Sequence, residues 1–457
     1  MAGIAFELKK ILRKRGLSAV VAAFGYSFAL SSGPYFITIM SLILVNFFAY
    51  SFVERREELT QFQVAVTHLI AFSLILSGFS TLYLIRFLAD MIFLKRTESI
   101  IPNMMGAVLI NMSVGFVLSF FFSMFVLAPH TGCLFAMAFN FSFTVLMGLW
   151  TLNTILTGFK SYKYILFSYA VSYLLFIALS FLLVYFGLFG LMSAFALSNS
   201  LLFSLLISYI LRNYYSNTLL SFDFLKEEKY RNLIITGFLY NFGLWADKLV
   251  FWYNPNTSTP ALGPLNYSVV YDIPIFLAYL SIAPGISAMF LKVEWEFAEH
   301  YDRYYKAVRE GATLDRIYLY GDELIRAARG VLLDTFRIQF IFSIFVVILQ
   351  EPLFTLFKLP KVYIPLFNIL LLGTSLQVVL LSLVALMFYF DRLKYALYTT
   401  AVFAVSNLTL SLLSIHLGPY FYGYGFAVSV FLSIAVGVVL LRRFLHEVHY
   451  YTFMHTV

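Results

Sequence analysis

The sequence contains few charged residues, which account for 12% of its 457 positions, whereas 61% are hydrophobic. An ordinary soluble domain carries about a quarter charged residues, so a soluble globular protein is excluded. There is one cysteine, Cys133, which excludes an internal disulfide and, within an apolar segment, predicts a small buried hydrophobic residue. A phosphate-binding glycine loop, a zinc-binding helix motif and an Asp-x-Asp pattern are absent from the sequence, so we do not expect catalysis.

Long apolar stretches are what the sequence has in abundance. Segments that are apolar on all sides, such as Val108–Leu127, argue against the ~10-residue alternation of a membrane β-barrel. A helix satisfies its own backbone in hydrocarbon and crosses ~30 Å at ~1.5 Å per residue. The sequence therefore predicts an all-α polytopic membrane protein with twelve transmembrane helices, near residues 17–49, 64–88, 103–128, 131–157, 164–187, 189–211, 231–253, 268–291, 331–350, 365–390, 395–416 and 419–441.

Basic residues are distributed unevenly between the connections. If the basic N-terminus is cytoplasmic, most of the 31 Lys and Arg residues fall on the cytoplasmic side. The opposite side receives only Arg55, Arg56, Lys358 and Lys361. Because cytoplasmic loops carry the excess of Lys and Arg, we expect both termini in the cytoplasm. The apolar run behind the N-terminus lacks a small-residue cleavage site, so we expect no cleaved signal peptide.

A basic linker divides the twelve expected spans into two sets of six. Because six is an even number, the two sets have the same orientation, as in transporters built from parallel repeats. The expected organisation is a basic cytoplasmic segment, a six-helix bundle, a cytoplasmic linker, a second six-helix bundle with a cytoplasmic loop at 292–330, and a cytoplasmic tail. Their boundaries are 1–16, 17–211, 212–230, 231–441 and 442–457.

The seventh expected span contains two ionisable residues, Asp247 and Lys248. Each costs ~2.5–3.5 kcal/mol at a membrane helix centre on insertion scales. Adjacent residues on a helix point about 100° apart, so we do not expect these two simply to neutralise each other. Each is expected to need a partner from another helix or from water, and Asp272 and Arg337 are candidate partners. Other polar residues near span ends, such as His68, are expected to be structural.

Helical spacing places polar and aromatic residues on two adjacent stripes of the same span. Aromatic rings suit the apolar faces of sugars, and amide and charged groups can bind hydroxyls, so the span is a candidate wall of a carbohydrate passage. The alternative is that Lys248 snorkels to the outer end and that the tryptophans belong to the interfacial belt. The candidate transport-pathway residues are Tyr240, Asn241, Trp245, Asp247, Lys248, Trp252 and Asp272.

The first expected span is interrupted by Gly33 and Pro34. Proline lacks a backbone donor and clashes with the preceding helical turn, so a kink is expected near the middle of the span. The two residues are the candidate conformational hinge.

The loop 292–330 is the largest polar element, with Gly311 between two charged, helix-compatible segments. An amphipathic pair of helices on the cytoplasmic surface fits this pattern. The expected contacts with the headgroup interface or a partner protein come from Trp295, Tyr301, Tyr304 and Tyr305. Acidic residues around His300 imitate a metal site, but a solvated helix face explains them better, because no closed His/Cys spacing accompanies them. We expect no metal and no cofactor.

Several of these motifs together resemble the PelG family, which is the membrane subunit of Pel exopolysaccharide export. The resemblance lies in five segments and covers essentially the whole chain: Gly3–Leu12 (GIAFELKKIL), Ser31–Pro34 (SSGP), Tyr240–Lys248 (YNFGLWADK), Asp272–Phe276 (DIPIF) and Glu294–Tyr305. It implies a bacterial inner-membrane transporter of the multidrug/oligosaccharidyl-lipid/polysaccharide (MOP) flippase superfamily, with two six-helix bundles around a central cavity.

The resemblance also implies a substrate and partners. The polymer is rich in N-acetylgalactosamine, partly deacetylated, and destined for the biofilm matrix. The implied partners are the cytoplasmic glycosyltransferase PelF and the membrane proteins PelD and PelE, of which PelD senses cyclic di-GMP. The expected function is therefore export of nascent polysaccharide as the glycosyltransferase extends it.

Three other functions remain open. A flippase for lipid-linked oligosaccharides needs a cationic cavity, and intramembrane arginine is scarce. An ion-coupled efflux transporter for small molecules would use Asp247 as a proton or sodium site. A membrane polymerase or acyltransferase ranks last, because the large loop lacks a catalytic constellation.

Overall fold

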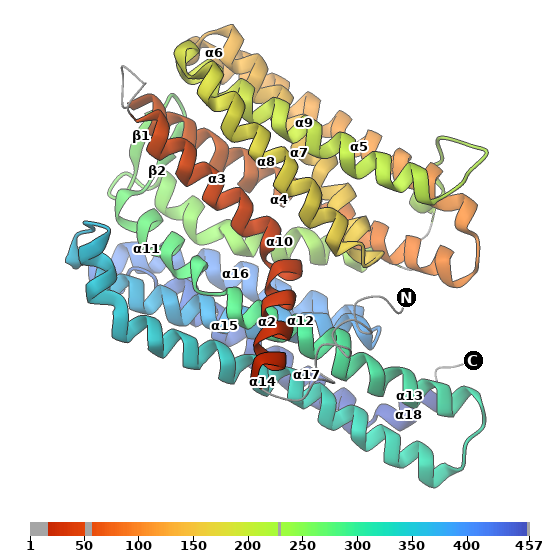
Figure 1. Cartoon of the computed structure of the whole chain (residues 1–457). Helices are drawn as coiled ribbons and strands as arrows, with labels where there is room; N and C mark the ends of the chain where they lie inside the picture. The colour runs from red at the N-terminus through yellow and green to blue at the C-terminus, as the bar shows by residue number, and fades with distance from the viewer. Residues whose placement is uncertain (1–16, 51–56, 227–229, 455–457) are drawn as a thin grey trace. The chain divides into compact units, whose positions relative to one another are not determined.

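The computed structural model describes residues 17–50, 57–226 and 230–454, which are almost entirely helical (Figure 1). Their contacts divide the chain into two compact units. The central unit is Gly33–Val269, and the terminal unit combines the described part of Met1–Ser32 with that of Val270–Val457.

Most helices of the central unit are long enough to cross a membrane. Within this unit α4 packs against α7 and α10, α7 against α5 and α9, and α8 against α3 and α9. The bounds are α3 Gly33–Ala49, α4 Glu57–Phe93, α5 Ile100–Phe121, α6 Ala128–Thr131, α7 Cys133–Gly158, α8 Tyr162–Leu183, α9 Gly187–Asn213, α10 Arg231–Tyr253, β1 Thr259–Leu262 and β2 Leu265–Tyr267.

The terminal unit combines the first described helix with the described helices of the last two fifths of the chain. Here α16 and α15 pack against α17, α14 packs against α12, α13 and α15, and α2 packs against α12. The bounds are α2 Leu17–Ser31, α11 Val269–Leu280, α12 Ala283–Leu291, α13 Ala298–Arg309, α14 Leu314–Leu356, α15 Ile364–Tyr389, α16 Leu393–Leu417, α17 Tyr424–His446 and α18 Val448–Met454.

The units differ from the two bundles expected at 17–211 and 231–441. The helix α10 belongs with the N-terminal helices of the central unit, because it packs along α4. The helix α2 belongs with the C-terminal helices, because it packs on α12, where the Ser27 hydroxyl donates to the Ser287 carbonyl (2.8 Å). The contacts therefore group one helix of each unit differently from the order in the sequence, and the division into two six-helix bundles remains a prediction.

Nine helical stretches of the described residues are long and apolar enough to span a membrane, or ten if the bent pair α2 and α3 counts as one span. The number is below the expected twelve for two reasons. The stretch Tyr162–Asn213 contains two expected spans joined by the short turn Val184–Phe186, and the polar helix α10 is not among the candidates. The chain is a multi-pass membrane protein, and the twelve-span count and the cytoplasmic termini remain predictions.

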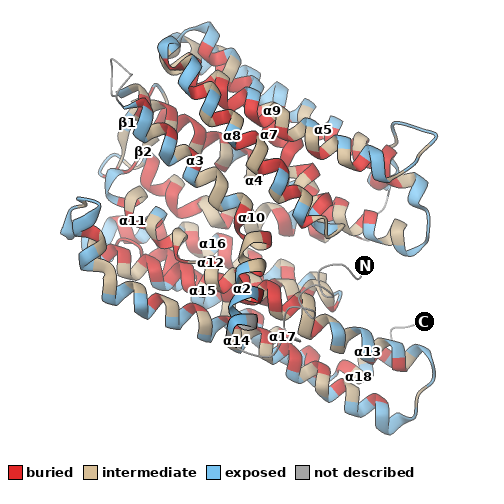
Figure 2. Cartoon of the chain, in the orientation of Figure 1, coloured by how far each residue is buried: buried red, intermediate tan, exposed pale blue. Residues whose placement is uncertain are grey.

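Many buried hydroxyls of both units donate to a carbonyl of their own helix. Ser142 and Thr151 of α7 donate to the carbonyls four residues earlier, and Ser375 and Ser382 of α15 do the same. Because hydrocarbon offers no water, such bonds let small polar residues pack between helices at low cost. Figure 2 shows buried residues on the packed sides of the helices and many exposed residues along α14.

The helix α14 corrects the expected loop structure. It runs unbroken for 43 residues from Leu314, so the charged segment after Gly311 is the start of a spanning helix rather than a separate surface helix. The segment before it likewise continues α12 through the π-helical turn Lys292–Phe297 into α13. Gly311 has a φ of +68°, which favours glycine at this turn.

Two further expectations can be compared with the structure, and one further feature was not expected. The helix breaks at Ser32, immediately before Gly33, where the kink was expected. Cys133 was expected to be buried but is exposed, because it is the first residue of α7 after the turn at Gly132. The connection between α10 and α11 forms the antiparallel hairpin β1–β2, which the sequence analysis did not anticipate despite the Gly263-Pro264 turn signal.

Candidate functional site

The helix α10 carries most of the candidate transport residues and lies against α4 of the same unit. Its position depends on two glycines that face each other across the helix crossing. A Cβ added at Gly78 would lie 2.7 Å from the Gly237 carbonyl oxygen, and one added at Gly237 would lie 2.2 Å from the Gly78 oxygen. Only glycine allows this approach, which is typical of closely packed membrane helices.

Asp247 and Lys248 form a buried ion pair on α10. Lys248 Nζ lies 3.2 Å from Asp247 Oδ1 and 3.3 Å from Oδ2, and it also donates to the Leu244 carbonyl (2.8 Å). The side chains are 0% exposed for Asp247 and 7% for Lys248. The expectation that adjacent positions would not neutralise each other is therefore wrong, because the four-carbon stem of Lys248 curls back to the neighbouring carboxylate.

A tryptophan lies beside this ion pair. The Lys248 ammonium is 5.7 Å from the centroid of the Trp245 ring, within range of a cation–π interaction. Trp245 is half-buried, and its ring lies 5.9 Å from that of Trp252. The lysine therefore does not snorkel to the end of the helix as the alternative interpretation required. Its charge is held inside the central unit.

Two residues of the expected stripe pack against α4 instead of standing open. Trp252 is 2% exposed and stacks on His68, with the ring centroids 4.5 Å apart. Asn241 Nδ2 donates to the Leu74 carbonyl (2.8 Å). His68 was expected to be structural, and its Nδ1 lies 2.9 Å from the Val64 carbonyl oxygen. Of the candidate residues on α10, Tyr240, Asn241 and Trp245 retain partial exposure.

The two residues proposed as partners for the ion pair belong to the terminal unit. Asp272 lies half-buried in the first turn of α11. Arg337 of α14 pairs with Asp334, at 3.3 Å, rather than with Asp247 as expected. The spacing of three residues on one helix was the available signal for this pairing, because side chains at i and i+3 are neighbours on the helix surface.

A broken helix in the terminal unit is a feature that the sequence analysis missed. The break falls between α11 and α12, where Gln339 of α14 replaces the lost backbone bonds. Its Oε1 accepts from the Gly285 amide (3.0 Å), and its Nε2 donates to the Ser281 carbonyl (3.1 Å). Broken helices in membrane transporters place backbone groups at functional positions. The available signal was Pro284-Gly285 inside an apolar run.

The aromatic residues expected to bind a partner mostly pack within the terminal unit. Tyr304 is 0% exposed, and its hydroxyl lies 3.2 Å from His449 Nδ1 and donates to Thr452 of α18 (3.3 Å). Tyr304 therefore anchors α18 and is not accessible to a partner, contrary to expectation. Tyr301, Tyr305 and Trp295 are half-buried, and the rings of the first two are in contact, with centroids 4.5 Å apart and planes tilted by 45°.

Comparison with known structures shows the fold. An outward-facing multidrug resistance MATE family transporter of the MOP superfamily aligns with a TM-score of 0.62 at 14% identity, covering 92% of this chain and 96% of that one. A MOP superfamily transporter from Pyrococcus furiosus gives 0.63 at 14% identity with the same coverage. A MATE in its bent conformation gives 0.65 at 13% identity and covers 97% of both chains. These likenesses establish the MOP transporter fold alone.

A comparison with curated proteins finds no match. A protein-family comparison matches residues 1–453 to the PelG family, whose description is "Putative exopolysaccharide Exporter (EPS-E)". The match covers nearly the whole chain and agrees with the helical transporter fold of both units. The chain belongs to the PelG family.

Proposed function

We propose that this protein exports a nascent Pel-type exopolysaccharide, rich in N-acetylgalactosamine, across the bacterial inner membrane. The observation that carries the proposal is the family match over residues 1–453. The MOP transporter fold supports a role in transport rather than in catalysis. The protein therefore moves a polymer that a partner enzyme makes.

Within the central unit, the segment of α10 around Trp245 is the proposed contact with sugar residues. Trp245 and Tyr240 are half-buried aromatic side chains, which can stack on the apolar face of a pyranose ring. The Asp247–Lys248 pair fixes the position of Trp245, because the ammonium lies 5.7 Å from the ring centroid. Because the charges of Asp247 and Lys248 neutralise each other, they would not bind a charged polymer tightly as it passes.

The proposed partners are the cytoplasmic glycosyltransferase PelF and the membrane proteins PelD and PelE. Docking is proposed on the segment from Trp295 to Tyr305, of which Tyr304 is excluded by its burial. The half-buried edges of Trp295, Tyr301 and Tyr305 supply aromatic contact area beside the charged surface of α13. The enzyme would then release its product next to the membrane.

Polymer secretion by cells that carry single variants of this chain tests the proposal. Trp245→Ala is expected to abolish secretion at normal protein levels, whereas Trp245→Phe retains part of it because a ring remains. Tyr253→Ala is the matched control, since Tyr253 is an exposed aromatic residue at the end of the same helix. Unchanged secretion in Trp245→Ala would exclude this segment as the sugar contact, and drug sensitivity without a secretion defect would indicate small-molecule efflux.

A further inference from the structure

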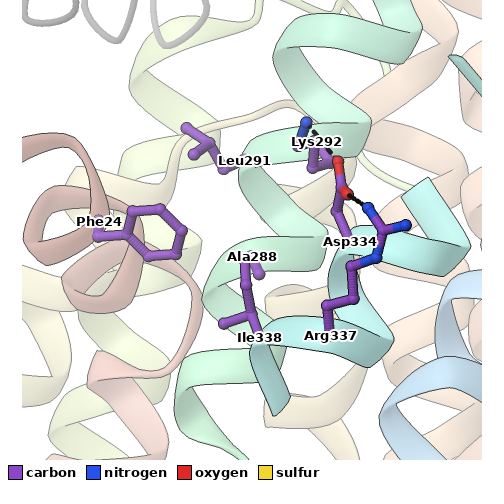
Figure 3. A pocket seen from close by; sticks show the side chains of 7 residues that line it. All are labelled: Phe24, Ala288, Leu291, Lys292, Asp334, Arg337 and Ile338. Atoms are coloured by element: carbon purple, nitrogen blue, oxygen red, sulfur yellow. Dashed lines mark hydrogen bonds and ion pairs between the residues drawn. The ribbon is translucent and has the colours of Figure 1, made fainter. Parts of the chain in front are cut away.

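The terminal unit contains a pocket of about 290 Å³ at one end of α12, between α2 and α14 (Figure 3). Four of its lining side chains are apolar and form its floor, and three are charged and lie together at one side. The lining residues are Phe24, Ala288, Leu291, Lys292, Asp334, Arg337 and Ile338. The pocket thus offers both an apolar surface and a charged group of side chains, as an amphipathic ligand requires.

The charged side of the pocket pairs two cations with two carboxylates, and the Arg337 guanidinium keeps hydrogen-bond donors that these pairs do not use. Asp334 is engaged at both oxygens, by Lys292 Nζ at 2.7 Å and by Arg337 Nη1 at 3.3 Å. Lys292 also pairs with Glu296 (2.7 Å). The Arg337 side chain is 66% exposed, and a guanidinium carries five N–H donors. Most of its donors therefore remain for an anionic group at the pocket mouth.

The surface around Arg337 is apolar. Leu333, Phe336, Phe340 and Ile341 of the same helix are all exposed, and α14 is the least buried of the candidate spans. A water-soluble anion would approach Arg337 across a hydrocarbon-facing surface, whereas a membrane lipid already lies there. An arginine of a candidate span, among exposed apolar residues, is an arrangement in which a protein can hold a lipid headgroup.

We propose that this pocket binds an anionic phospholipid. The Arg337 guanidinium donates charge-assisted hydrogen bonds to the oxygens of the headgroup phosphate, with Lys292 beside it. An acyl chain lies against the floor formed by Phe24, Leu291 and Ile338. Asp334 opposes the headgroup charge and limits the affinity, so that the lipid can exchange. The site is independent of the exported substrate, since it concerns the lipid environment of the terminal unit.

Native mass spectrometry of the purified full chain, titrated with phosphatidylglycerol and with phosphatidylcholine, tests the proposal. The wild-type protein is expected to retain phosphatidylglycerol preferentially. Arg337→Gln should raise the dissociation constant for phosphatidylglycerol about fivefold, which is the contribution of one interfacial arginine. Arg329→Gln is the matched control, because Arg329 is an exposed arginine of the same helix outside the pocket, and its dissociation constant should be unchanged.

Two further variants separate lipid binding from a structural role of the ion pairs. Asp334→Asn removes the opposing charge and should lower the dissociation constant for phosphatidylglycerol, while Ile338→Trp fills the floor and should raise it. Inorganic phosphate in excess should not displace the lipid, because it has no acyl chain. Equal affinities in the wild type and Arg337→Gln, displacement by phosphate, or weaker binding in Asp334→Asn would each overturn the proposal. Unchanged thermal unfolding of Arg337→Gln in phosphatidylcholine confirms that the variant is folded.

Discussion

Removing one partner of the Asp247–Lys248 pair should destabilise the protein strongly. Both side chains are almost fully buried, and Nζ lies within 3.3 Å of both carboxylate oxygens. Breaking a buried pair by deleting one charge costs ~3–5 kcal/mol, because the other charge remains buried without compensation. Asp247→Asn and Lys248→Met are each expected to lower the free energy of unfolding by about this amount.

The double variant Asp247→Asn/Lys248→Met should lose much less than the sum of the two single variants. It buries no charge, and replacement of a buried ion pair by neutral groups is often close to neutral. The difference between the sum and the double variant measures the coupling of the pair. The close crossing at Gly78 and Gly237 is unchanged in this variant, so the packing of α10 on α4 should persist.

Steric-trapping or denaturant unfolding of the full chain in lipid bicelles gives these free energies. A matched control is Glu310→Gln, whose carboxylate lies at an exposed pair with Lys306 (3.8 Å) and should cost under ~1 kcal/mol. If the single variants cost no more than this control, or if the double variant costs as much as their sum, the ion pair does not stabilise α10 and the reasoning is refuted.

Three other changes are expected to have measurable effects. Gly237→Ala should cost ~1–3 kcal/mol of unfolding free energy and loosen cross-linking between α4 and α10, because its Cβ would meet the Gly78 carbonyl; wild-type stability would contradict the close crossing. Gln339→Leu should cost ~1–3 kcal/mol by leaving the Gly285 amide unpaired, and should speed its hydrogen exchange, whereas unchanged exchange would exclude this bond. Burial lowers the pKa of His449 in the folded protein below its ordinary value of about 6.5. As the pH falls below that value, the unfolded state binds the proton first, so the folded state loses stability and the contact of α18 should weaken. Faster hydrogen exchange of α18 at acid pH, lost in His449→Gln, checks this result; pH-independent exchange would contradict it.

Local chemistry made some elements predictable from the sequence. The spans followed from long apolar runs, because helices alone satisfy the backbone in hydrocarbon. The break at Ser32 followed from Gly33 and Pro34, since the loss of a donor and the ring clash act within one helical turn. The resemblance to the PelG family predicted the MOP transporter fold, and the similarity to solved structures confirms it.

The arrangement of side chains was less predictable, because it depends on contacts between distant segments. The association of α10 with α4 rests on Gly78 meeting Gly237, and neither glycine signals its partner in sequence. The direction of the Cα–Cβ bonds suggested that Asp247 and Lys248 would diverge, but the length of the lysine side chain overrides that direction. The sequence did not reveal that α14 is one continuous helix. Its first part is charged and its second part apolar, so the two parts differ in hydropathy although both favour helix.

The most direct test of the proposed function uses sealed vesicles that contain this protein and the glycosyltransferase proposed as its partner. A labelled nucleotide sugar is supplied on the cytoplasmic face without any lipid-linked donor, and polymer protected inside the lumen is quantified. Protected polymer that disappears when this chain is omitted is the predicted result. Polymer found only outside the vesicles, with transport restored by a lipid-linked oligosaccharide, would contradict synthesis-coupled export and identify a flippase.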